Sequence, residues 1–202
     1  MLRDDNGFSL IELLIALLLG SMLLAMVISL YVTSVSNGAR ILKYSRLRTD
    51  LQSIISLMET DIRRAGYGGR EFLVGSGATK TVDSINTADK DCIVYYYNHD
   101  GATSISHANK MGFRLNRDKH EIQFGSGVDP LAVNCYESGY WRALSDKQFI
   151  KITSLAFTES EVSSASATMR SVRIDITGEL VSESEAQHSI KTKVQVRNLE
   201  FN

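Results

Sequence analysis

A single apolar run near the N-terminus, residues 8–35, constrains this chain more than any other feature of its sequence. Its 28 residues hold one charged side chain, Glu12, one glycine, Gly20, and no proline. As a helix rising 1.5 Å per residue the run extends about 42 Å, whereas a bilayer core needs only about 20 residues. It is also longer than the apolar part of a secretory signal peptide, which has about 7–15 residues. The sequence therefore predicts a membrane-spanning helix that continues beyond the bilayer.

Glu12 is the residue in this run that needs an explanation. An ionised carboxylate in lipid is costly and calls for a partner. A plain signal anchor explains the apolar run but not this carboxylate, and a cleaved secretory signal requires a shorter run. A third interpretation gives the carboxylate a partner: the α-amine of Phe8, which is cationic near neutral pH and is free only if the chain is cut after Gly7.

The segment Gly7-Phe8-Ser9-Leu10-Ile11-Glu12 resembles the class III signal of type IV prepilins and pseudopilins. The resemblance implies that a membrane-embedded prepilin peptidase cleaves the chain after Gly7 and methylates the new N-terminal residue, Phe8. It also implies that Glu12, the fifth residue of the mature chain, guides assembly by pairing with the N-terminal amine of a neighbouring subunit. These roles are expectations at this stage.

Basic residues after the apolar run give a different orientation from the resemblance. Four of them (Arg40, Lys43, Arg46 and Arg48) follow the run, against Arg3 before it. The positive-inside rule taken alone places the C-terminal part in the cytoplasm. The prepilin resemblance implies the reverse: a single-pass inner-membrane protein with a cytoplasmic N-terminus and a periplasmic head, later assembled into a pilus. We follow the resemblance.

The helical pattern continues past the membrane with a new character. One face carries apolar residues at helical spacing: Leu47, Leu51, Ile54, Ile55, Met58 and Ile62. This spacing predicts an amphipathic helix packed on the rest of the chain. Glycines 66, 68 and 69 end it, so we expect one helix from Phe8 to about Ala65. The expected domains are a leader (1–7), a transmembrane or filament-core helix (8–37), its amphipathic half (38–66) and a β-rich head (67–202).

The head has the alternating patterns of short strands. We expect six to eight of them in an antiparallel sheet laid on the helix, which is an α+β, pilin-like fold. Polar segments are expected to form loops, namely Gly75–Asp91, Ser160–Thr168 and Glu179–Glu185. The strand candidates are Cys92–Tyr97, Met111–Leu115, His120–Phe124, Trp141–Leu144, Phe149–Phe157, Val172–Ile176 and Ile190–Val196.

Few side chains of the head suggest chemistry. The four histidines lack ligand spacing, and the chain has no G-x-S-x-G elbow, phosphate-binding loop or H-E-x-x-H motif. We therefore predict no enzyme, catalytic residue, metal or cofactor. The formal net charge of −1, from 22 basic and 23 acidic residues, disfavours DNA as a partner.

Tyr95, Tyr96 and Tyr97 could stack on a ligand, but alternation along a strand favours core burial. Lys191, Lys193 and Arg197 line one face of the last predicted strand, and a solvated sheet face explains them better than a binding surface.

A second resemblance concerns the end of the helix. The segment Arg63-Arg64-Ala65-Gly66-Tyr67-Gly68-Gly69 is similar to the corresponding turn of PilW-type minor pilins, and Val194–Asn198 resembles the last strand of PilW-type and J-type subunits. It implies a minor pilin that helps to initiate pilus assembly near the tip. The implied partners are other minor and major pilins, prepilin peptidase, the inner-membrane assembly platform and membrane lipid. The alternatives are a J-type minor pseudopilin of type II secretion and a tip module that binds a surface or DNA.

The two cysteines, Cys92 and Cys135, can be a disulfide or two separate buried thiols. A bridge between them would stabilise the fold by about 4 kcal/mol in the chain-entropy model. In the PilW-type pattern a cysteine often follows the helix-ending turn, whereas Gly69 and Arg70 stand there in this chain. Cys92 and Cys135 are therefore the only intrachain pair available.

Overall fold

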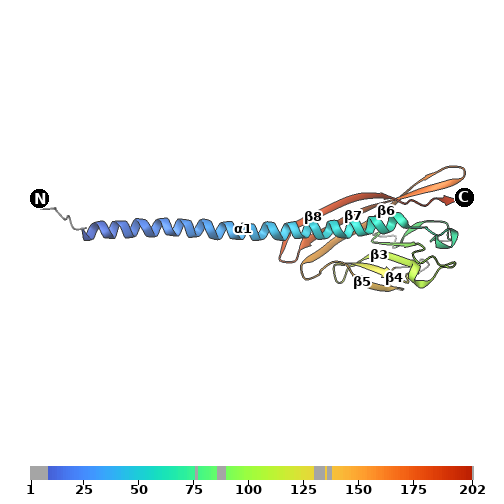
Figure 1. Ribbon diagram of the computed structural model, residues 1–202, viewed down its shortest axis with the longest axis horizontal. Coiled ribbons are helices and arrows are strands. Elements are labelled where there is room, and N and C mark those ends of the chain that lie inside the picture. Colours follow the sequence, from blue (N-terminus) through green and yellow to red (C-terminus); the bar gives the residue numbers. More distant parts are fainter. Residues whose placement is uncertain (1–8, 76, 86–89, 130–134, 136–137, 202) are drawn as a thin grey trace. The chain divides into compact units, whose positions relative to one another are not determined.

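The computed structural model describes residues 9–75, 77–85, 90–129, 135 and 138–201, and divides into two units, Met1–Lys43 and Tyr44–Asn202. Both contain part of one helix, α1 (Leu10–Arg64), which has 55 residues (Figure 1). Its most apolar 18-residue window has a mean hydropathy of 2.7 and no buried residue. Within the described ranges, α1 is the one helix long and apolar enough to cross a membrane.

The part of α1 in the second unit is amphipathic, as predicted. The residues buried there include all six of the predicted apolar stripe: Leu47, Leu51, Ile54, Ile55, Met58 and Ile62. They join one hydrophobic core with residues of both β-sheets. The prediction that this half of the helix packs on the head is confirmed.

The helix ends where a glycine is required. Gly66 has φ +75° and donates its N–H to the carbonyl of Tyr96 at 2.7 Å. A Cβ at this position would lie 2.8 Å from Cγ2 of Thr81, so both the left-handed backbone and the space favour glycine. Asn198 then caps the helix, because its side-chain amide donates to the carbonyls of Arg64 and Ala65 at 3.2 and 2.8 Å.

Two antiparallel sheets make up the rest of the second unit. The first has five strands in the order β1-β2-β3-β4-β5. They are β1 (Val82–Ile85), β2 (Cys92–Tyr96), β3 (Lys110–Asn116), β4 (Glu121–Ser126) and β5 (Tyr140–Ala143). The second has the order β6-β7-β8, with β9 also paired to β7; its strands are β6 (Ile150–Ser163), β7 (Ala167–Leu180), β8 (Glu183–Gln195) and β9 (Glu200–Phe201). Two short 3₁₀ helices, Arg70–Phe72 and His107–Asn109, lie in the connections.

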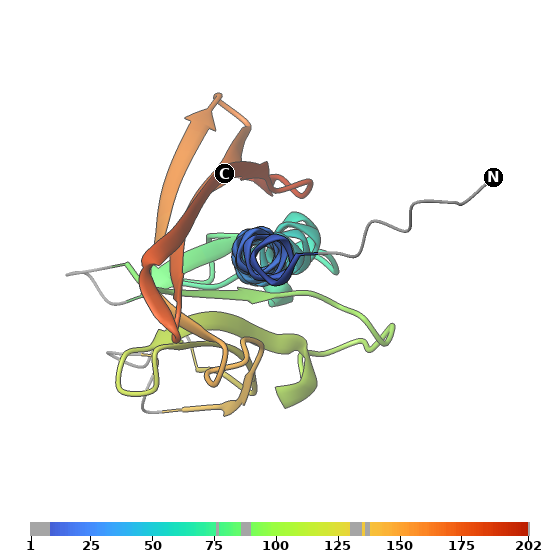
Figure 2. The same ribbon diagram turned by 90° about the vertical axis from the view of Figure 1, so that its left-hand side faces the viewer.

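Strands β2 and β3 of the first sheet are buried on both faces. Ile93, Tyr95 and Phe113 belong to the main core, which also holds the apolar stripe of α1 and the inner face of the second sheet. Cys92 and Val94 alternate with them and belong to a second, smaller core on the opposite face, together with Phe72, Tyr96, Val128 and Cys135. Figure 2 looks along α1 and shows both sheets beside it. The α+β, pilin-like fold predicted from the sequence is confirmed.

Three expected loops are wrong. Ser160–Thr168 is mostly strand, because β6 continues to Ser163 and β7 begins at Ala167. Hydroxyl pairs such as Ser163–Thr168, at 2.9 Å, join the two strands there. Glu179–Glu185 is likewise a tight hairpin in which only residues 181 and 182 lie outside β7 and β8. The segment Gly75–Asp91 contains β1. The described strands number nine in two sheets, rather than six to eight in one.

Candidate functional site

The N-terminal motif is the first candidate site. Gly7 and Phe8 lie outside the described residues. Glu12 lies in the first turn of α1, where its backbone N–H donates to the carbonyl of Ser9 at 3.0 Å. A carboxylate in the first turn is favourable for the helix dipole. The structure therefore places Glu12 at the start of the helix, and the predicted pairing with an amine stays a prediction.

Apolar side chains surround this carboxylate along the first unit. They are exposed by more than half, from Leu10 and Ile11 through Leu30, Tyr31 and Val32 to Val35. Contiguous exposed apolar surface of this kind marks contact with a membrane or another protein. The first unit thus presents an apolar helix surface interrupted by one acidic group.

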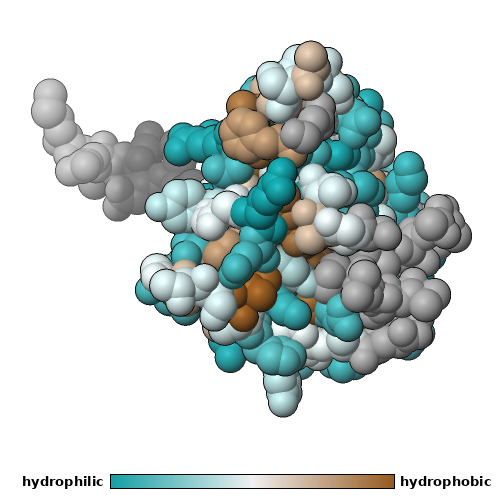
Figure 3. All heavy atoms as spheres, turned by 90° about the vertical axis from the view of Figure 1, so that its right-hand side faces the viewer, coloured by the Kyte–Doolittle hydropathy of each residue, from teal (hydrophilic) through white to brown (hydrophobic). Residues whose placement is uncertain are grey.

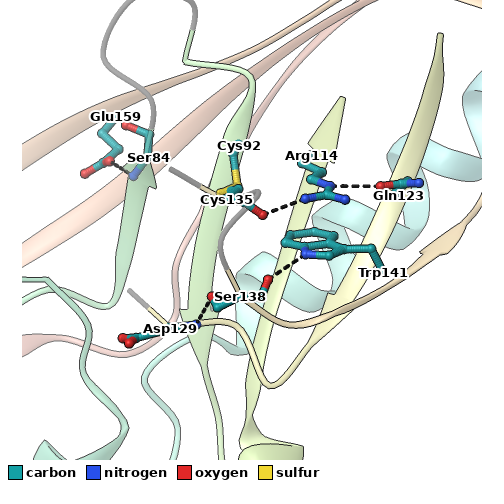
Figure 4. Close-up of a disulfide and its surroundings, with 9 residues drawn as sticks. All are labelled: Ser84, Cys92, Arg114, Gln123, Asp129, Cys135, Ser138, Trp141 and Glu159. Carbon is teal, nitrogen blue, oxygen red and sulfur yellow. Dashed lines mark hydrogen bonds between the residues drawn. A yellow bond between two sulfur atoms is a disulfide. The ribbon is translucent and has the colours of Figure 1, made fainter. Parts of the chain in front are cut away.

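The disulfide is the second candidate site (Figure 4). Cys92 of β2 and Cys135 are bonded, with their Cα atoms 6.5 Å apart and a sequence separation of 43. Arg114 supports the bridge: its guanidinium donates to the carbonyl of Cys135 at 2.6 Å and to Gln123 at 2.8 Å, and it lies 4.1 Å from the ring centre of Trp141. Sequence patterns do not predict this support, because Arg114 and Trp141 come from different strands. The bridge and the hydrogen bond from Arg114 thus fasten Cys135 to β2 and β3 of the first sheet.

The three consecutive tyrosines are core residues, as predicted. Tyr95 is fully buried and its hydroxyl donates to Asp61 of α1 at 3.3 Å. Tyr96 points into the smaller core and its hydroxyl donates to the carbonyl of Val128 at 3.4 Å. Burial raises the pKa of both hydroxyls well above the usual value. Tyr97 is buried with Tyr95, yet it also lines the cleft described next.

A cleft of about 370 Å³ lies at the end of α1, and the sequence did not predict it. Three chain segments form it: the end of the helix, the residues that follow β2, and the residues that follow β8. Its lining residues are Arg63, Arg64, Tyr67, Tyr97, Asn98, His99, Arg197 and Asn198. Lys191 and Lys193 are exposed on β8, and Arg197, also exposed, follows the end of that strand. Three of the lining side chains are arginines and none is acidic, so the cleft is suited to an anion.

Histidines and acidic residues do not gather elsewhere in a reactive arrangement. In the part of the chain that the structure describes, no three His, Cys, Asp or Glu side chains come together as metal ligands. His99 contacts Asn109 at 3.1 Å, and His188 contacts Tyr44 at 3.4 Å. These contacts are those of structural or surface residues.

Comparison with known protein families gives two matches. The prokaryotic N-terminal methylation motif matches residues 2–28. The family described as prepilin peptidase-dependent protein B matches residues 40–196, which is more than half of the chain. Searches of curated proteins and of solved structures found no match. Since the second match covers β1 to β8 and α1 from residue 40 onward, and the first covers the beginning of the apolar helix, the chain belongs to the prepilin peptidase-dependent protein B family and is a type IV prepilin-like protein.

Proposed function

We propose that this chain is a minor pilin of the PilW type, which takes part in initiating type IV pilus assembly near the tip after cleavage by prepilin peptidase. One observation carries the proposal: α1 begins within the match to the methylation motif and continues as one helix into the core of the head. A subunit built in this way can be anchored by one half of α1 and can present a folded head on the other.

The processing site and the assembly carboxylate depend on each other in this proposal. Cleavage after Gly7 frees the amine of Phe8, which is then methylated. Glu12 pairs with the Phe8 amine of a neighbouring subunit, since a carboxylate in an apolar setting needs a cationic partner. Desolvation offsets part of the attraction, so the pair contributes mainly by fixing how far one helix slides past the next.

The proposed orientation has residues 1–7 in the cytoplasm, residues 8–37 in the inner membrane, and the amphipathic half (38–66) and head (67–202) in the periplasm. The disulfide supports this orientation, because structural disulfides form and persist in oxidising compartments such as the periplasm. The proposed partners are other minor and major pilins, prepilin peptidase, the inner-membrane assembly platform and membrane lipid.

Glu12→Gln is the decisive substitution. We expect the variant to be inserted, cleaved after Gly7 and methylated at Phe8, but to reduce surface pili at least about tenfold, because a charge-assisted hydrogen bond contributes about 1.5–3 kcal/mol and 1.4 kcal/mol is a factor of ten. Mass spectrometry of the mature chain checks processing, and electron microscopy counts the pili.

Glu71→Gln is the matched control, because Glu71 is exposed and its side chain has no partner among the described residues. It should leave both processing and pili unchanged. Normal piliation by Glu12→Gln would contradict the assembly role. Loss of type II secretion with normal pili would instead identify a J-type pseudopilin.

A further inference from the structure

We propose that the cleft at the end of α1 binds an acidic sugar unit of a polysaccharide. This inference goes beyond the proposed role in pilus assembly and does not depend on it. It rests on the charge, the aromatic walls and the unused hydrogen-bonding groups of the cleft residues. The end of the head that holds the end of α1 carries hydrophilic and hydrophobic side chains side by side (Figure 3).

Backbone hydrogen bonds hold the three walls of the cleft together. The N–H of Arg197 donates to the carbonyl of Arg63 at 3.1 Å, and the N–H of Asn98 donates to the carbonyl of Tyr67 at 2.7 Å. The amide of Asn198 fastens the third segment to the last carbonyls of α1. The cleft is therefore formed before any ligand arrives, which reduces the entropic cost of binding. Its volume of about 370 Å³ suits a ligand of one or two sugar rings.

Two guanidinium groups of the cleft are available to an anion. Arg63 and Arg197 are exposed, and among the described residues neither side chain has an ion pair or hydrogen bond. Arg64 is already engaged, since it pairs with Asp61 at 3.3 Å and lies over the ring of Tyr97 at 5.5 Å. A guanidinium fork matches the two oxygens of a carboxylate. With no acidic side chain in the lining, nothing there repels a carboxylate.

The aromatic walls indicate what carries that carboxylate. The ring of Tyr67 is 61% exposed, so a ligand in the cleft can reach it. Tyr97 also lines the cleft, but its ring is buried, stacked on Tyr95 at 6.4 Å and covered by Arg64 at 5.5 Å. The exposed ring of Tyr67 is therefore the one that can bind the apolar C–H face of a sugar and place a hydroxyl at its rim.

Unused hydrogen-bonding groups favour a ligand rich in hydroxyls. The hydroxyls of Tyr67 and Tyr97 have no hydrogen-bond partner among the described residues, and both residues line the cleft. A sugar acid supplies donors and a carboxylate within one ring. A nucleic-acid strand would instead need a row of cations along its backbone, and two unpaired arginines do not make one.

The test uses the full chain in detergent micelles and a linear tetramer of galacturonic acid as the probe, with binding followed by calorimetry. The methyl-esterified tetramer is the matched control ligand, because it keeps the rings and loses the charges. We expect binding of the acid and at least about tenfold weaker binding of the ester. Absence of binding, or equal binding of the two, would overturn the proposal.

Four variants separate the cleft from general charge effects. Arg63→Gln and Arg197→Gln should each weaken binding of the tetramer about tenfold. Tyr67→Ala should weaken it similarly, while Tyr67→Phe, which keeps the ring, should stay within about threefold of the original chain.

Arg142→Gln is the control for charge, since Arg142 lies on β5, is exposed and has no described partner. This variant should bind the tetramer as tightly as the original chain does. Thermal unfolding of each variant checks that the head remains folded. If hexaglutamate or oligothymidylate binds as tightly as the tetramer and depends on the same two arginines, the cleft is a general anion site and the proposal is wrong.

Discussion

Asp61 shows how a single side chain couples the stability of the head to pH. It is buried on α1, accepts a hydrogen bond from Tyr95 and pairs with Arg64. Burial raises the pKa of Asp61, and Arg64 and Tyr95 oppose this rise without cancelling it. A carboxyl whose pKa rises on folding binds its proton more tightly in the folded state. Its stabilising contribution is therefore complete below its unfolded pKa and is lost as the pH rises through its folded pKa.

Asp61→Asn removes this dependence and keeps an acceptor for the Tyr95 hydroxyl. We expect the variant to be as stable as the original chain, or more stable, at pH 7, because the lost pair with the half-exposed Arg64 contributes little. Below the unfolded pKa of the aspartate, the free energy of unfolding of the original chain should increase relative to that of the variant. Urea unfolding at several pH values measures both. A loss of more than about 2 kcal/mol at pH 7 would contradict this view, and Asp118→Asn on the exposed hairpin turn serves as the control.

At the scale of elements, the two-residue strand β9 depends on one ion cluster. Arg170 of β7 donates to both carboxylate oxygens of Glu200, at 2.8 and 2.9 Å, and also pairs with Glu159 and Glu161. Glu200 accepts two further hydrogen bonds from the backbone and hydroxyl of Thr81, at 2.6 and 3.0 Å. The cluster thus ties the end of the chain to β7 and to the segment before β1.

Glu200→Gln should destabilise the head by about 3 kcal/mol, because it leaves the buried Arg170 without its bidentate partner. Burial raises the pKa of Glu200, but hydrogen bonds from Arg170 and Thr81 outweigh it and the pKa is lowered. The stabilisation from Glu200 is therefore present above its unfolded pKa and is lost as the pH falls through its folded pKa. Denaturant unfolding measures the difference in free energy of unfolding between the original chain and Glu200→Gln. This difference should be smaller in acid than at pH 7. The side chain of Glu161 is more than half exposed, so Glu161→Gln should lower the free energy of unfolding far less than Glu200→Gln does. An equal loss in the two variants would refute the assigned roles.

The disulfide makes a separate contribution to the first sheet. Replacing Cys92 and Cys135 together by serine removes a cross-link that spans 43 residues, which should lower the free energy of unfolding by about 4 kcal/mol in the chain-entropy model. Denaturant unfolding of the full chain, with and without reductant, measures the loss. The reduced original chain should behave like the double variant, whereas a difference between them would show that the serines themselves disturb the smaller core.

Local patterns predicted the long elements well and the short ones poorly. The apolar stripe from Leu47 to Ile62 and the alternation in β7 and β8 follow from periodicity, which a sequence displays directly. Serines and glutamates dominate the two hairpin ends, and this composition predicts loops there. Cross-strand pairing nevertheless keeps most of these residues in β6, β7 and β8. Strand β9 has only two residues and is held by the contact of Glu200 with Arg170, which lies thirty residues earlier in the chain. No local sequence pattern therefore predicts it.

At the scale of the whole molecule, the two candidate sites differ in how visible they are in the sequence. Gly7, Phe8 and Glu12 lie within six consecutive residues, so their motif can be read without a structure. The cleft brings together residues near positions 63–67, 97–99 and 197–198. Each of these segments reads alone as a helix end or a polar turn. Only the folded head places two unpaired arginines beside an exposed tyrosine.

The orientation of the chain, meaning the side of the membrane on which the head lies, can be tested through the disulfide. The basic residues that follow the apolar run favour a cytoplasmic head, whereas the disulfide needs an oxidising compartment. We expect both cysteines of the full chain in growing bacteria to resist maleimide labelling unless the sample is first reduced. In cells that lack the periplasmic thiol oxidase, both should be labelled directly. Direct labelling in normal cells would place the head in the cytoplasm, and the positive-inside count would then have been the better guide.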